Sequence, residues 1–69
     1  MFDKKRLQAQ MVLAGMNVKD VSAALGINET TFYRKLNNDG DFSRKEISQL
    51  VEILKIEDPM IIFFADEIA

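Results

Sequence analysis

The sequence predicts an all-α protein of five short helices, the second and third of which form a helix-turn-helix. Apolar residues recur at spacings of three and four along most of the 69 residues, and polar cap residues precede the expected helix starts. Over residues 18–37, two such patterns are separated only by a three-residue break at Gly26, which is the layout of a helix-turn-helix. The length suits one compact domain over residues 1–69.

The first helix is predicted over residues 3–14, where apolar residues at helical spacing precede the terminator Gly15: Leu7, Met11 and Ala14. Its first turn carries three cations, Lys4, Lys5 and Arg6. The helix dipole favours acids at that end, so either Asp3 compensates for the cations or they serve a ligand. Both interpretations fit the sequence.

The second helix is predicted over residues 18–25, with Asn17 as its cap and Asp20 able to return a hydrogen bond to the cap backbone. Gly26 tolerates the left-handed backbone that a helix needs just past its end. Asn28 then caps a third helix over residues 29–37, which buries Phe32 and Leu36. The residues left for a recognition surface are Glu29, Thr30, Tyr33 and Arg34.

The fourth helix has the clearest pattern. Ser43 and Glu46 form a capping box, so the helix starts near Arg44, and its apolar positions follow helical spacing without a gap: Ile47, Leu50, Val51 and Leu54. Asp58 followed by Pro59 predicts a cap and a first helical residue, which together open a short last helix.

The C-terminal apolar segment, residues 59–69, contains five consecutive residues that are apolar all round the helix. One face can pack on the domain, whereas the opposite face has no obvious cover. The sequence therefore allows a homodimer interface, a closing layer of the domain's own core, or a short strand. The interface residues in the first case are Ile61, Ile62, Phe63 and Phe64.

Charge is divided unevenly along the chain, although the formal net charge is only −2. Residues 1–45 hold eight cations and five acids, whereas residues 46–69 hold one cation and six acids. The basic N-terminal part, residues 1–45, predicts modest, salt-sensitive nucleic-acid binding.

Without Cys or His the chain lacks the usual metal ligands and general base, so we expect no metal, no cofactor and no enzyme activity. With no signal peptide and no membrane-length apolar run, a cytoplasmic location is expected.

Residues Gly15 to Lys55 resemble a known domain. Leu25, Gly26, Ile27 and Asn28 stand at its L-G-[VI]-[ST] turn, and Thr31 and Phe32 occupy the T-[IF] position that follows. The segment is similar to the lambda-repressor-like domain of Cro/C1-type (XRE family) regulators, and the chain also resembles small phage and prophage regulators of Gram-positive bacteria. Two positions depart from the family pattern. Val18 replaces the usual phosphate-contacting Gln, and Lys35 stands where an apolar residue is usual.

The resemblance implies a transcriptional regulator, of phage or prophage repressor type, that binds an operator in double-stranded DNA as a homodimer. It implies base contacts from Glu29, Thr30 and Arg34 in the third helix. The residues expected to contact the DNA backbone are Asn17, Lys19, Tyr33, Lys35, Asn37, Asn38, Arg44 and Lys45. No small-molecule ligand is implied.

A protein-binding module on the same scaffold is the alternative, with a phage antirepressor or a polymerase subunit as its partner. The acidic overall charge, Val18 in place of Gln and Glu29 in the recognition helix favour this alternative. The cluster of Arg34, Lys35, Arg44 and Lys45 favours DNA.

Overall fold

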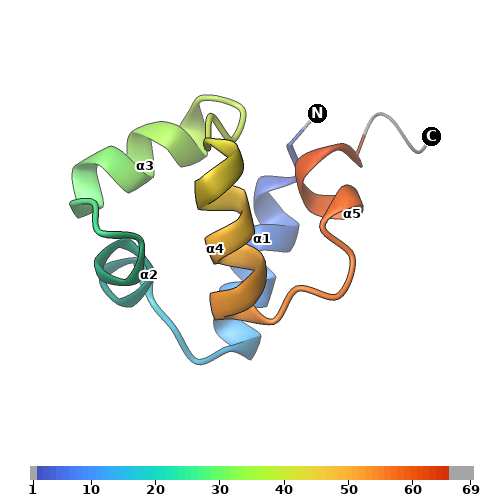
Figure 1. Cartoon of the computed structure of the whole chain (residues 1–69), viewed down its shortest axis with the longest axis horizontal. Coiled ribbons are helices and arrows are strands. Elements are labelled where there is room, and N and C mark those ends of the chain that lie inside the picture. Colours follow the sequence, from blue (N-terminus) through green and yellow to red (C-terminus); the bar gives the residue numbers. More distant parts are fainter. Residues whose placement is uncertain (1, 66–69) are drawn as a thin grey trace.

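The computed structural model describes residues 2–65, which form five α-helices and no strand. The helices are α1 (Lys4–Leu13), α2 (Val18–Leu25), α3 (Glu29–Asn37), α4 (Arg44–Leu54) and α5 (Met60–Phe63). Helix α4 runs through the middle of the molecule, with α2 and α3 on one side, α5 on the other and α1 behind it (Figure 1). The predicted all-α fold is confirmed.

Local cap signals fix where the first four helices begin. The Asn17 side chain accepts a hydrogen bond from the Asp20 N–H, and the Asp20 carboxylate accepts one from the Asn17 N–H. Ser43 and Glu46 make the same reciprocal pair at α4, while Asp3 and Asn28 accept single bonds at α1 and α3. Each pair satisfies N–H groups that a helix start leaves without intrahelical partners. The predicted starts of α2, α3 and α4 are confirmed, whereas α1 begins at Lys4 with Asp3 as its cap, one residue later than predicted.

A single apolar core joins the helices. Phe32 of α3 is fully buried, and so are Leu7 of α1 and Leu50 of α4. Ser22 is the one buried polar residue found among residues 2–65, and its hydroxyl donates to the Lys19 carbonyl at 3.1 Å. A buried hydroxyl with a backbone partner leaves no unpaired polar atom in this part of the core.

An aromatic cluster that the sequence did not predict closes one end of this core. The Phe2 ring lies 6.1 Å from Phe42 and 5.7 Å from Phe63, measured between ring centroids. The Phe2 N–H donates to the Asp39 carboxylate at 3.3 Å. The Asp3 N–H donates to the Ile62 carbonyl at 2.6 Å. The start of the chain is therefore held between the α3–α4 loop and α5.

The last helix differs from the sequence prediction at its start. Helix α5 begins at Met60, so Pro59 rather than Asp58 is the residue that precedes it. The Asp58 carboxylate still accepts a hydrogen bond from the Met60 N–H at 3.2 Å, which satisfies one donor of the first turn. The end of the predicted apolar segment, residues 66–69, lies outside the described residues.

The apolar residues of α5 divide between core and surface. Ile62 and Phe63 are buried in the domain's own core, as the core alternative predicts, and this removes both side chains from the surface. Ile61 is half-buried and Phe64 is exposed. Any homodimer interface at this end therefore depends on Ile61 and Phe64 alone among the four predicted residues. Among residues 2–65, every helix is too short or too polar to cross a bilayer.

Candidate nucleic-acid interface

The turn between α2 and α3 sets the position of the third helix. Gly26 adopts a left-handed conformation with φ of 74°, and the following Ile27 N–H donates to the Ser22 carbonyl at 3.0 Å. Asn28 then caps α3 through a 2.7 Å bond from the Thr31 N–H. Only Ile27 and Asn28 separate the glycine from α3, and so short a connection between two helices is typical of a helix-turn-helix.

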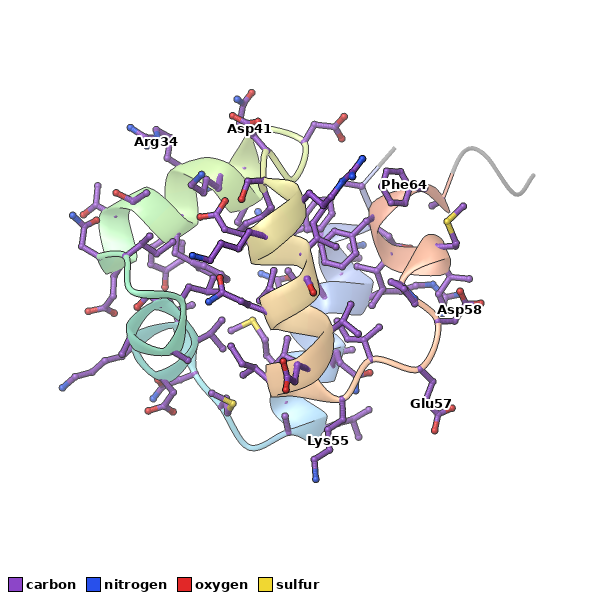
Figure 2. The ribbon with its side chains drawn as sticks, viewed as in Figure 1. Arg34, Asp41, Lys55, Glu57, Asp58 and Phe64 are labelled. Atoms are coloured by element: carbon purple, nitrogen blue, oxygen red, sulfur yellow. The ribbon has the colours of Figure 1, made fainter. Side chains whose placement is uncertain are left out.

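One face of α3 is turned to solvent. We define the α3 outer face as the five exposed residues Glu29, Thr30, Tyr33, Arg34 and Asn37. Their spacing places them together on one side of the helix, because Phe32 and Leu36 are buried on the other. Arg34 projects away from the body of the molecule, on the side opposite α5 (Figure 2). All three predicted base-contacting residues therefore lie on one accessible face.

Lys35 does not belong to the α3 outer face. Its side chain is only 21 % exposed and its ammonium lies 3.0 Å from the Glu46 carboxylate of α4, itself 14 % exposed. The ion pair explains how a lysine is accommodated at a position that is usually apolar. The methylene groups of the Lys35 side chain are largely buried, and its ammonium is paired with Glu46. The Lys35 charge is thus matched within the protein, although the sequence predicted it as a phosphate contact.

Glu46 carries two roles, since the same carboxylate oxygen accepts the Ser43 N–H at 2.8 Å. Burial opposes ionisation of Glu46, but the Ser43 N–H and the Lys35 ammonium outweigh it and hold the pKa of Glu46 below its usual value of 4.5. The carboxylate therefore stabilises the fold above the ordinary pKa, and this contribution is lost as the pH falls through the folded-state pKa.

Glu46→Gln is expected to lower the free energy of unfolding at pH 7 by on the order of 0.5 kcal/mol, because the amide keeps the cap but loses the ion pair. The difference from the wild type should shrink as the pH falls below 4.5, measured by urea unfolding at several pH values. Glu52→Gln, at an exposed site on the same helix, is the control. A gap between wild type and Glu46→Gln that stays constant with pH would contradict this account.

The remaining predicted backbone contacts lie around the α3 outer face. Lys19 is exposed in the first turn of α2, and Arg44 and Lys45 are exposed in the first turn of α4. Asn38 is exposed at the end of α3, and Asn17 is exposed but uses its side-chain oxygen as the cap of α2. Two helix N-termini thus stand beside α3, each with a cation in its first turn, an arrangement that attracts phosphate.

Val18 has an apolar role where the family usually has Gln. Its side chain is half-buried and packs against the core, as does that of Met16. It lines a shallow groove between the end of α1 and the start of α3, together with Val12 and Tyr33. Lys19 is therefore the side chain that the first turn of α2 offers to a ligand.

Helix α3 turns Arg, Thr and Asn side chains to solvent, follows α2 across a tight turn, and lies beside the starts of α2 and α4. These features define a helix-turn-helix DNA-binding domain. Residues 6–58 match the family of the Cro/C1-type HTH DNA-binding domain, and the chain belongs to that family. No curated protein and no solved structure matches the chain. The match covers all of α2, α3 and α4, and confirms the resemblance to Cro/C1-type regulators noted in the sequence.

Proposed function

We propose that this DNA-binding protein is a sequence-specific transcriptional regulator that inserts α3 into the major groove of an operator. The observation that carries the proposal is the α3 outer face, which gathers donors and acceptors on an exposed helix of the size that the major groove admits. A regulator of this kind works in the compartment that holds the DNA, for which we propose the cytoplasm. No catalytic activity is proposed.

Base reading falls to Arg34, Thr30 and Glu29. Arg34 can donate two hydrogen bonds to guanine O6 and N7, and Thr30 can donate to a base edge or contact a thymine methyl. Glu29 can accept from cytosine N4 and is also favoured by the dipole at the start of α3. Phosphate contacts would come from Lys19, Tyr33, Asn37, Asn38, Arg44 and Lys45. Lys35, also expected in this role, is paired with Glu46, whereas Asn17 caps α2 through its side-chain oxygen and keeps its amide N–H groups for a phosphate.

We further propose that the protein acts as a homodimeric repressor of phage or prophage type. One short helix reads only a few base pairs, so two copies on paired half-sites raise affinity and specificity together. Of the four predicted interface residues, a second copy can still reach Ile61 in α5 and the exposed Phe64 directly after it. A dimer bound over a promoter represses by occupying the DNA that polymerase needs.

Selection of bound sequences from a random duplex library tests this function. The expected product is an inverted repeat whose half-sites lie about one helical turn, roughly 10 base pairs, apart. Its affinity should fall steeply with salt, because cations on the protein displace counterions from phosphates. No enrichment, together with no salt-dependent binding, would refute the DNA function.

A protein-binding module remains the second candidate, and one observation favours it. Val12 and Leu13 at the end of α1 are 78 % and 80 % exposed, which is unusual for large aliphatic side chains on a small domain. An antirepressor or a polymerase subunit that covers this pair would be the partner. If duplex selection fails, the surface around Val12 and Leu13 is the first place to substitute.

A further inference from the structure

The three cations that begin α1 lie at the edge of the proposed interface. Lys4, Lys5 and Arg6 are all exposed, and the first turn of α1 contains no acid. Asp3 caps the helix and pairs with Arg6 at 3.3 Å, so this acid already serves the third cation. A cluster of positive charge at a helix N-terminus opposes the helix dipole.

A hydrogen bond connects this cluster to the recognition helix. The Lys4 ammonium donates to the Asn37 side-chain oxygen, which joins the start of α1 to the last residue of α3. The backbone on the N-terminal side is also fixed, because the Phe2 N–H bonds to Asp39 and the Asp3 N–H bonds to Ile62. The Lys4–Asn37 bond therefore joins the start of α1 to the α3 outer face, while the other two bonds fix the preceding backbone to the α3–α4 loop and to α5.

The Lys4–Asn37 bond orients the groups that face solvent. An ammonium has three N–H donors, of which Asn37 takes one, and the Asn37 amide keeps its two N–H donors because its oxygen is turned to Lys4. The pair thus presents hydrogen-bond donors and a positive charge to solvent, while its one acceptor, the Asn37 side-chain oxygen, is already bonded to Lys4. That combination suits a phosphate oxygen, which only accepts hydrogen bonds.

We propose that Lys4 and Asn37, extended by Lys5, form a phosphate-binding site that contacts the DNA backbone next to the bases read by α3. This inference rests on the proposed function and adds a contact on α1 to it. The site supplies charge that Lys35 does not, because Lys35 is paired with Glu46. Since phosphate contacts carry no sequence information, the site raises affinity without changing the preferred operator.

The test compares three variants that each remove one exposed lysine charge: Lys4→Gln, Lys5→Gln and Lys55→Gln. Lys55 ends α4 at the opposite end from the α3–α4 loop and serves as the matched control (Figure 2). The readout is the slope of log Kobs against log salt concentration on the selected operator. We expect its magnitude to fall by about 0.9 for Lys4→Gln and for Lys5→Gln, and to stay unchanged for Lys55→Gln.

A second readout locates the contact on the DNA. Ethylation interference should identify phosphates beside the α3-contacted bases that matter for the wild type and no longer matter for Lys4→Gln, while the selected base sequence stays the same. Wild-type slopes for Lys4→Gln and Lys5→Gln would overturn the α1 contact and leave the regulator function standing. A wild-type protein without salt-dependent duplex binding would overturn both. If Lys4→Gln fails to fold, Lys5→Gln decides, because it keeps the Lys4–Asn37 bond.

Discussion

Arg34→Glu is expected to abolish operator binding without unfolding the protein. The side chain is exposed and projects away from the core, so its replacement leaves the packing of α3 unchanged (Figure 2). A bidentate arginine–guanine contact contributes about 1–3 kcal/mol of base discrimination. The substitution would remove this proposed contact and would also set a carboxylate against the phosphates. At the upper end of its range, about 3 kcal/mol, loss of the base contact alone lowers affinity roughly 100-fold. With the added repulsion, we expect a loss of at least about this size.

The measurement is titration of the selected operator with each variant, with thermal unfolding followed by circular dichroism to show that the fold is kept. Lys55→Glu is the matched charge reversal, because this exposed residue lies at the far end of α4 from the α3–α4 loop. We expect that variant to bind nearly as well as the wild type, with a small loss from long-range repulsion. If Arg34→Glu binds the operator with wild-type affinity, the proposal that the α3 outer face contacts DNA is refuted.

Much of this fold could be predicted because residues close together in the sequence determine where its helices begin. A cap involves side chains and N–H groups three residues apart, as at Asn17 with Asp20 and at Ser43 with Glu46. The α3 outer face could be predicted for a related reason. Once Phe32 and Leu36 are assigned to the core, helical geometry leaves only the other side of α3 for a ligand.

The features that sequence reasoning missed depend on contacts between distant parts of the chain. Nothing near Phe2 indicates that it packs on Phe42 and Phe63. For α5 the sequence left the core and interface alternatives open, because the choice depends on distant contacts such as the bond between Asp3 and Ile62. The Lys35–Glu46 pair has one weak sequence signal, which is a lysine at a position usually occupied by an apolar residue.

The Phe2 contact leads to the largest expected effect on stability, in Gly40→Ala. Gly40 has a φ of 67°, and a Cβ added there would collide with Cγ of the Phe2 ring. The substitution therefore combines left-handed strain of about 1–2 kcal/mol with expulsion of the ring from the aromatic cluster. Loss of a buried Phe side chain by truncation costs about 3–5 kcal/mol, which bounds the second effect. We expect a total loss of about 3 kcal/mol in urea unfolding, a large part of the stability of so small a domain.

Two comparisons separate strain from collision. Gly26 has a similar φ of 74°, but a Cβ added there would have no atom within 4 Å, so Gly26→Ala should show the strain alone. In a Phe2→Gly background both the ring and the Phe2 Cβ, which lies 2.8 Å from the added Cβ, are gone, and Gly40→Ala should then cost no more than Gly26→Ala does. Equal losses for Gly40→Ala and Gly26→Ala in the wild-type background would show that Phe2 does not pack against this turn. The Phe2 N–H also bonds to Asp39 in the same loop. Such a result would therefore also argue against the placement of the start of α1 beside α3.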